Sequence, residues 1–174
     1  MNIDSPVIFA DGTEFYKKLA VDYIQHDKGL FILAPSGSGK TFFVNNQTTW
    51  DWIDGDYLWP ATGADLSSDE WGDGDIEMIN IKSDIITIQA KNLGFWIIGS
   101  SNSFLRPDAI VIPPLEKHIE YISKRETGDY DGGAKSANME EVMEHRKIIL
   151  RWGDKGVPCF QSIGAATEFL SRRL

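Results

Sequence analysis

The stretch APSGSGKT at residues 34–41 constrains the fold of this chain more than any other feature. It follows the apolar run GLFIL, which has the composition of a buried strand, and it precedes FFV, which can begin a helix. The spacing matches G-x-x-x-x-G-K-[ST] at every position except the first, where Ala34 replaces glycine. Alanine fits there if its φ angle stays negative. A strand, a glycine-rich turn and a helix in this order predict a phosphate-binding loop, or P-loop.

Each position of the predicted P-loop has a physical role in binding phosphate. Small residues let successive backbone N–H groups turn inward as a nest for anions, and the helix N-terminus adds a partial positive charge. Lys40 is then expected to reach the β- and γ-phosphates of ATP, and the Thr41 hydroxyl to ligate Mg²⁺. The alternative is a loop rich in glycine and serine with an incidental lysine. The expected nest residues are Ser36, Gly37, Ser38 and Gly39.

Length and composition indicate one soluble domain over residues 1–174, since the chain is 42% hydrophobic and 25% charged. No stretch approaches the ~20 apolar residues that cross a membrane. The N-terminal sequence MNIDSPVIFADG lacks the regions of a secretory signal, so we expect a cytoplasmic protein with no membrane partner. Cys159 is the only cysteine, and its apolar neighbours predict a buried structural thiol.

The formal net charge of −9 disfavours a large surface for duplex DNA, because such binding relies on lysine and arginine neutralising phosphates. A local basic site remains compatible with this charge. Acidic residues concentrate in DLSSDEWGDGDIE at residues 65–77, which we interpret as a solvated loop rather than a metal or substrate site.

Short apolar runs alternate with helical patterns along the chain. This alternation predicts an α/β protein with a five-stranded parallel sheet and helices on both faces, and the P-loop motif adds the expectation of the P-loop NTPase fold. Polar clusters follow three of the strands, at residues 36–41, 54–56 and 100–103, where parallel sheets bind ligands. The expected strands end at Leu33, Asp54, Gly99, Ile112 and Phe160, and the expected helices cover residues 12–27, the run after Thr41, 75–92, 115–124, 139–152 and 165–173.

The second motif is Asp54-Gly55-Asp56, at the end of the second expected strand. If the strand stays extended, the two aspartates share a face, because side chains alternate along a strand. One carboxylate, Asp54, can then orient Mg²⁺ or its waters, and Asp56 can accept a hydrogen bond or proton from a substrate hydroxyl. The alternative is an ordinary Asp-Gly turn.

APSGSGKT followed by IDGDYLWP resembles the small P-loop kinases of the nucleoside monophosphate kinase group. It is similar to gluconate kinases and, more loosely, to shikimate kinases, over about residues 29–170. The phage-type kinases that phosphorylate 5-hydroxymethyluracil in DNA share this plan. The resemblance implies an ATP-dependent kinase whose catalytic residues would be Lys40, Asp54, Asp56 and Arg125.

The segment RPDAIVIPPLEKHIEYISKR is similar to the fourth strand and the following helix of these kinases. The resemblance implies that Arg125 contacts ATP phosphates from a lid at about residues 126–138, and that SIGAA cradles adenine. Arg146 or Arg151 could also return to the phosphates. A lid closes to exclude water from the reaction.

The chain departs from gluconate kinases at two points. The helix at residues 12–27 is an addition, and GSSNSF lacks their basic substrate signature, so the substrate is not carried over. We expect the acceptor to be a nucleotide, a nucleoside or another small hydroxyl compound. One alternative is a hydroxymethylated base in DNA, and another is a nucleotide-binding module without catalysis.

Four tryptophans near the second motif give the remaining hint about the acceptor, because indoles can stack on a nucleobase. Trp59 precedes Pro60, which favours an extended loop, so we expect its indole to face the acceptor rather than the core. Trp52 lies inside the strand and is expected to be packed. The expected substrate contacts are Asp56, Trp59 and Arg106; the four tryptophans are Trp50, Trp52, Trp59 and Trp71.

Overall fold

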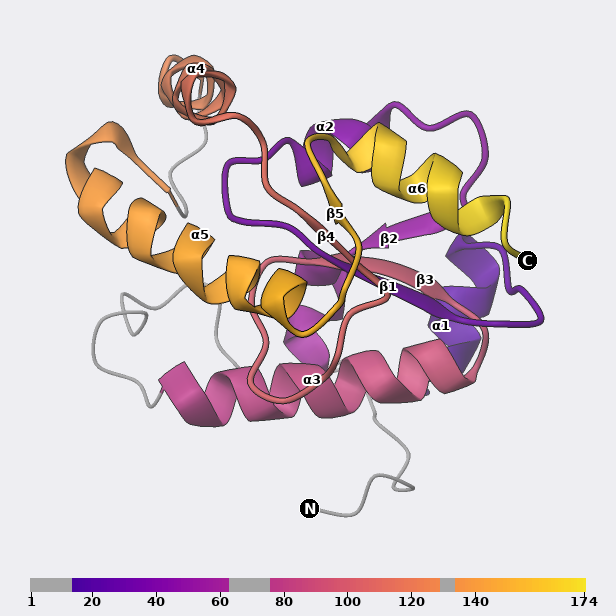
Figure 1. Ribbon diagram of the computed structural model, residues 1–174. Coiled ribbons are helices and arrows are strands. Elements are labelled where there is room, and N and C mark those ends of the chain that lie inside the picture. The colour runs from indigo at the N-terminus through magenta and orange to yellow at the C-terminus, as the bar shows by residue number, and fades with distance from the viewer. Residues whose placement is uncertain (1–13, 63–75, 129–133) are drawn as a thin grey trace. The chain divides into compact units, whose positions relative to one another are not determined.

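The computed structural model describes residues 14–62, 76–128 and 134–174, in which helices and strands alternate (Figure 1). The strands are β1 (Leu30–Leu33), β2 (Trp52–Asp54), β3 (Trp96–Gly99), β4 (Ala109–Val111) and β5 (Cys159–Phe160). The helices are α1 (Phe15–Asp22), α2 (Lys40–Asn45), α3 (Ile76–Asn92), α4 (Leu115–Glu126), α5 (Met139–Asp154) and α6 (Ile163–Ser171), with 3₁₀ helices η1 (Gly55–Thr62) and η3 (Ser136–Asn138).

The five strands form one parallel sheet in the order β2-β3-β1-β4-β5, which confirms the predicted α/β sheet. The registers pair Trp52 with Trp96 and Ile110 with Cys159. Strands β1 to β4 are buried along their whole length, which explains why β1, β3 and β4 are apolar runs in the sequence and why β2 is apolar up to Asp54.

Contacts between Cα atoms divide the chain into two compact units. The first unit comprises Met1–Phe31 and Gln47–Leu105, and the second comprises Ile32–Asn46 and Arg106–Leu174. The boundary falls inside β1. The prediction of a single domain over residues 1–174 stays a prediction.

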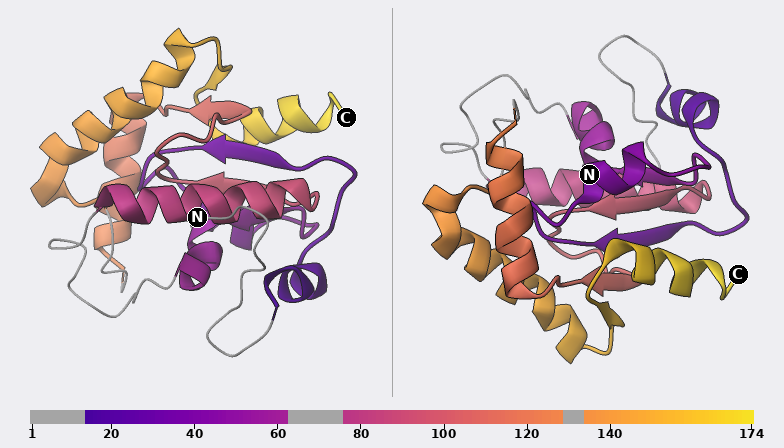
Figure 2. Two further views of the ribbon diagram at one scale, coloured as in Figure 1. Left: turned by 90° about the horizontal axis from the view of Figure 1, so that it is seen from below. Right: turned by 90° about the horizontal axis from the view of Figure 1, so that it is seen from above.

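In the first unit, α3 packs against β3 and η1, and Figure 2 shows α3 from two further sides. Phe95, Ile97 and Ile53 are fully buried there. Helix α1 is shorter than the predicted segment 12–27, whose first two residues lie outside the described ranges.

In the second unit, α5 and α6 both pack against β4, and α2 packs against α6. Helix α4 ends at Glu126, and a small apolar cluster of Ile122, Ala134 and Val142 joins it to the start of α5. This cluster holds the described ends of the predicted lid, whose residues 129–133 lie outside the described ranges.

The predicted burial of Cys159 is wrong, because its side chain is exposed. The reason is its place in β5, a two-residue strand at the edge of the sheet. An edge strand has a neighbour on one side only, so apolar neighbours in the sequence do not guarantee burial.

Among the described residues, no helix has the length and apolar character that a membrane crossing requires.

Candidate phosphate-binding site

The segment between β1 and α2 adopts a tight turn that depends on two glycines. Gly37 has φ +79° and Gly39 has φ +89°, both in the left-handed region that residues with a side chain rarely adopt. No other residue type has a positive φ in the described ranges. Ala34 therefore keeps a negative φ, as the sequence required for alanine at the first position of the motif.

Two polar side chains of the turn, those of Lys40 and Ser38, are buried. Lys40 begins α2 and is buried, although it carries a charge. Ser38 is also buried, and its Oγ has no hydrogen-bond partner among the described residues. A buried hydroxyl without a partner is costly, so a site that supplies an acceptor or donor for it would be stabilising. Thr41, one residue further on, is exposed.

Behind the turn lies His118 of α4, a fully buried side chain. Its Nε2 lies 2.8 Å from the carbonyl oxygen of Ser36, and its Nδ1 lies 2.9 Å from Nη1 of Arg146. The other guanidinium nitrogen of Arg146 donates to the Pro113 carbonyl at 2.8 Å. One histidine thus connects the P-loop segment to α5. Arg146 is one of the residues that the sequence offers for binding phosphate, but its described contacts are with His118 and with Pro113, which follows β4.

A second connection joins Ser36 to the end of the predicted lid. The Ala134 N–H donates to Ser36 Oγ at 3.1 Å. The carbonyl of the same residue accepts a hydrogen bond from Arg125, the predicted lid arginine. Arg125 is therefore half-buried beside the P-loop segment, with its guanidinium on a backbone carbonyl.

The pKa of His118 depends on its burial, on its hydrogen bond and on nearby charges. Burial is the largest cause that lowers its pKa, while its hydrogen bond with Ser36 raises it. Three positive charges lower the pKa further; in order of effect they belong to Arg146, Lys40 and Arg125. Positive charges from α2, α4 and α5 thus act on His118, and a positive field of this kind attracts polyanions.

The Asp54-Gly55-Asp56 motif lies in the first unit. The prediction that both aspartates share a face of an extended strand is wrong, because β2 ends at Asp54 and η1 begins at Gly55. Asp54 is buried and Asp56 is exposed, and the Asp56 N–H donates to Asp54 Oδ1 at 3.2 Å. A Cβ atom on Gly55 would lie 3.0 Å from the Cα of Gly99, so a side chain at position 55 would require the Gly99 backbone to shift by a few tenths of an ångström.

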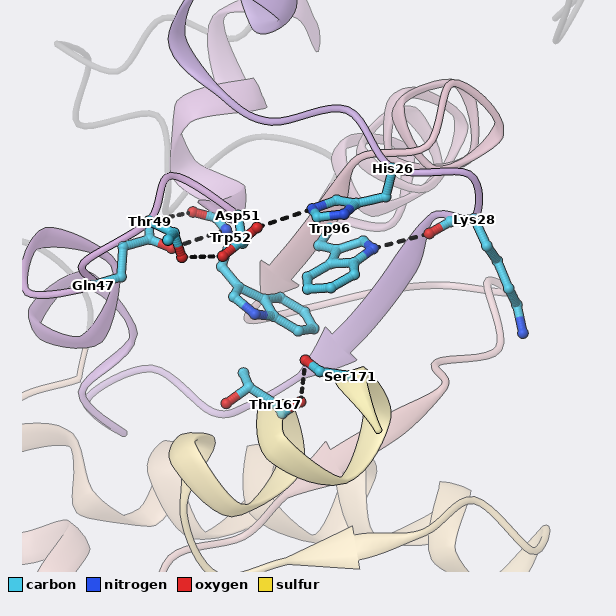
Figure 3. A network of polar contacts seen from close by, with 9 residues as sticks. All are labelled: His26, Lys28, Gln47, Thr49, Asp51, Trp52, Trp96, Thr167 and Ser171. Carbon is cyan, nitrogen blue, oxygen red and sulfur yellow. Dashed lines mark hydrogen bonds and ion pairs between the residues drawn. The ribbon is translucent and has the colours of Figure 1, made fainter. Parts of the chain in front are cut away.

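The tryptophans divide into packed and exposed ones. Trp52 is packed as predicted, with its ring 5.1 Å from that of Trp96 (Figure 3). His26 stacks on Trp96, as the same picture shows. The centroids of the two rings are 3.6 Å apart, and Nε2 of His26 lies 3.2 Å from Oδ1 of Asp51. Trp50, by contrast, is 56% exposed.

The prediction that Trp59 lies on an extended loop is wrong. It belongs to η1 and is only 8% exposed, because the 3₁₀ helix turns this segment back onto α3 and β3. The substrate role assigned to Trp59 is untested, and its indole has little free surface for stacking. Trp71 lies outside the described residues.

Tyr23, which follows α1, brings aromatic rings near Asp54. Its ring makes edge contacts with Trp50 at 6.1 Å and with Tyr57 at 5.4 Å. Burial raises the pKa of Tyr23 most, and the negative charges of Asp22 and Asp54 raise it further. The Tyr57 hydroxyl donates to Asp22. The helix that the sequence marked as an addition therefore contributes to the surroundings of Asp54.

The remaining predicted residues lie apart from these contacts. Arg106 is exposed and donates to the Lys155 carbonyl at 2.9 Å, and Arg151 is exposed on α5. The adenine segment SIGAA begins α6, where Ser162 caps the helix through the Ala165 N–H. A Cβ atom on Gly164 would meet no atom within 4 Å.

Sequence reasoning missed two residues, His118 and Asp84. Both occupy positions on helices where apolar residues are usual: His118 precedes the buried Ile122 by one helical turn, and Asp84 precedes the buried Ile85 and Ile86. Polar side chains in such positions need partners, and this is the signal that could have found them.

Across the described residues, no group of three or more histidine, cysteine or acidic side chains could hold a metal ion.

Comparison of the chain with protein-family models, with curated proteins and with solved structures gives no match.

Proposed function

We propose that this protein is an ATP- and Mg²⁺-dependent kinase that transfers the γ-phosphoryl group to the hydroxyl of a small compound. The P-loop motif and the Asp-Gly-Asp motif support this proposal, together with the resemblance to small P-loop kinases. The fold supports it at a coarser level, since a parallel α/β sheet is compatible with P-loop enzymes and with many others.

The observation that carries the proposal is the turn between β1 and α2, which contains two left-handed glycines, the buried Lys40, and a Ser38 hydroxyl without a hydrogen-bond partner among the described residues. Arg125 lies beside this turn, because it donates to the carbonyl of Ala134, whose N–H donates to Ser36 Oγ. A triphosphate supplies the negative charge and the oxygen acceptors that such a turn requires. Lys40 would bind the β- and γ-phosphates, and Arg125 would leave the Ala134 carbonyl to offset charge on the transferring group.

The two sequence motifs also supply oxygen donors of the kind that a magnesium ion takes. Thr41 is an exposed residue on the first turn of α2, and Asp54 carries a carboxylate; hydroxyl and carboxylate oxygens are hard donors that Mg²⁺ takes beside phosphate oxygens. When bound, Mg²⁺ would neutralise charge that develops on the phosphate oxygens. The assignment of Asp54 to the metal comes from the sequence motif.

The transfer itself moves one phosphoryl group and one proton. The acceptor oxygen forms a bond to the γ-phosphorus while the bond from that phosphorus to the β–γ bridging oxygen breaks, and ADP leaves. Asp56 would receive the hydroxyl proton, as an exposed carboxylate can exchange it with water afterwards. The buried Lys40 would hold the phosphates in place during the transfer.

The distribution of charge favours a small acceptor over DNA. The first unit holds 15 of the 26 acidic residues but only 5 of the 17 basic ones, which gives it a formal charge of −10 against +1 for the second unit. Phosphate backbones are bound by lysine and arginine, so the acidic unit that carries Asp54 and Asp56 suits an acceptor without phosphates. All arginines belong to the second unit: Arg106, Arg125, Arg146, Arg151, Arg172 and Arg173.

The test is a transfer assay with γ-labelled ATP, Mg²⁺ and a panel of acceptors. The panel contains nucleosides, nucleotides, sugars, amino alcohols and DNA with hydroxymethylated bases. Labelled product from an uncharged or cationic acceptor is expected. Binding of ATP without transfer to any acceptor would favour the regulatory module, and no binding of ATP at all would refute both readings.

A further inference from the structure

The peptide group between Ser36 and Gly37 has a fixed direction in this structure. Its carbonyl oxygen points at Nε2 of His118, 2.8 Å away. The described chain contains no cis peptide bond, and in a planar trans peptide the C=O and N–H groups point in opposite directions. The Gly37 N–H is therefore directed away from His118.

The partners of His118 also fix its protonation state. The Ser36 carbonyl can only accept a hydrogen bond, so Nε2 carries the hydrogen. The Arg146 guanidinium can only donate, so Nδ1 is unprotonated. The imidazole is thus neutral with its hydrogen on Nε2. A proton on Nδ1 would place two donors 2.9 Å apart and two positive charges in contact.

We propose that His118 is a positioning residue which, held by Arg146, aims the Gly37 N–H at the phosphate that the P-loop binds. This inference rests on the proposed function, since it requires a phosphate ligand at the loop. His118 touches no reacting atom. It acts through the Ser36–Gly37 peptide group, and Arg146 acts through His118.

Two further observations support a role of His118 in the geometry of the loop, beyond filling space. Ser36 is held a second time by the Ala134 N–H on its hydroxyl, so rotation of its peptide group is resisted from two sides. A Cβ atom on Gly37 would lie 2.7 Å from Cγ1 of Ile122 and 3.4 Å from Nε2 of His118. Helix α4 therefore lies directly against the loop, and a change at His118 is transmitted to Gly37 without an intermediate residue.

Two variants of His118 test the contacts of its two ring nitrogens separately. In His118→Gln the side-chain amide nitrogen can take the place of Nε2 and donate to Ser36. In His118→Asn the amide oxygen can take the place of Nδ1 and accept from Arg146, while the contact with Ser36 is lost. Lys117→Gln is the matched control, because Lys117 is the exposed neighbour on the same helix and pairs with Glu120. Circular dichroism checks that all variants fold.

The probe is pyrophosphate, followed through the amides of the P-loop by nuclear magnetic resonance. Labelling with ¹³C-serine and ¹⁵N-glycine selects only glycines that follow serine, which in this sequence are Gly37 and Gly39. We expect pyrophosphate to shift both amides in the wild type, in Lys117→Gln and in His118→Gln. In His118→Asn the Gly37 response should be lost, while that of Gly39 remains. Affinity for Mg·ATP should fall roughly 5- to 10-fold in the Asn variant, the factor of one ordinary hydrogen bond, and stay near the wild-type value in the Gln variant.

The pH dependence of pyrophosphate affinity gives a second test, because a residue that only fills space would not change it. The groups that face His118 are the Ser36 carbonyl of the loop, Lys40 of α2, Arg125 of α4 and Arg146 of α5. Protonation of His118 breaks its contact with Arg146, so pyrophosphate affinity of the wild type should decrease at acid pH more than that of His118→Gln.

Two results would overturn the inference, and they are distinguishable. If the wild type binds Mg·ATP and both His118 variants give the same Gly37 response and affinity, His118 only fills space, and the proposed function stands. If the wild type and Lys40→Ala both fail to bind Mg·ATP and pyrophosphate, the proposed function fails and the inference fails with it.

Discussion

Oδ2 of Asp84 accepts the backbone N–H of Phe104 at 2.6 Å, and the same oxygen accepts the N–H groups of Ser103 and Leu105 at 2.9 Å each. Asp84 is 1% exposed on α3. One buried carboxylate oxygen thus closes the loop that follows β3. Burial raises the pKa of Asp84 most, while these three hydrogen bonds lower it by a smaller total.

Replacing Asp84 should separate the cost of its buried charge from the value of its hydrogen bonds. Asp84→Ala leaves three backbone donors without their acceptor and should lower the free energy of unfolding by at least about 1–3 kcal/mol. Asp84→Asn retains an acceptor and removes the charge, so it should cost less at pH 7. Because the folded pKa is raised, the native state holds the proton more tightly, and stability from this group should fall as pH rises above 3.8. Urea unfolding of both variants at pH 4 and pH 7 checks this; equal losses at both pH values would contradict it.

Lys40→Ala should lower kcat by ~10²-fold or more, because it removes a charged donor from the transferring phosphoryl group. The measurement is steady-state transfer with the best acceptor from the panel. Lys147→Ala is the control, since that lysine is exposed and pairs only on the surface with Glu144 among its described contacts. An unchanged kcat in Lys40→Ala would refute the proposal that this protein is a kinase.

Asp54→Asn and Asp56→Asn should abolish most transfer while ATP still binds. Asparagine preserves size and, at position 54, the oxygen that accepts the Asp56 N–H. Calorimetric titration with ATP and a transfer assay separate binding from chemistry. In a regulatory module, both variants would differ from the wild type only by a modest shift in Mg²⁺ affinity.

The tryptophans should differ in their effect on stability. Trp52→Ala empties a buried aromatic site and should cost ~3–5 kcal/mol of the free energy of unfolding, and Trp59→Ala should also be costly because Trp59 is 8% exposed. Trp50→Ala should change stability by no more than about 0.5 kcal/mol, since its indole is 56% exposed. Chemical denaturation of the three variants tests this order. A large loss in Trp50→Ala would show that its edge contact with Tyr23 is part of the core.

The stability of the wild type should fall as pH decreases below 6.5. The pKa of His118 is lowered in the folded state from its ordinary value of 6.5, so the unfolded state binds the proton first. The contribution is fully present above 6.5 and is lost as pH falls toward the folded pKa. Thermal unfolding of the wild type and His118→Gln between pH 5 and pH 7.5 measures it, and the variant should lack this part of the pH dependence.

The strands could be predicted from the sequence because each is a short apolar run that a glycine, proline or polar residue ends. The tight turn after β1 could be predicted for a similar reason, because Gly37 and Gly39 have positive φ angles that residues with a side chain rarely adopt. These are local properties, and local properties are what a single sequence contains.

Burial at chain turns and edges could not be predicted, because it depends on neighbours distant in sequence. Trp59 is buried since η1 folds back, and Cys159 is exposed since β5 is an edge strand. The partners of Arg125 and Arg146 are likewise tertiary: a carbonyl after the predicted lid for one, and a histidine on another helix for the other.

The exposure of Cys159 also makes this chain convenient for spectroscopy. It is the only thiol in the sequence, so a maleimide dye or spin label would attach at one place without any engineering. Partial burial raises the pKa of this thiol although the residue is classed as exposed, so coupling should proceed faster in mildly alkaline buffer than at neutral pH. A reporter on the strand beside β4 would follow the opening of the sheet edge during unfolding.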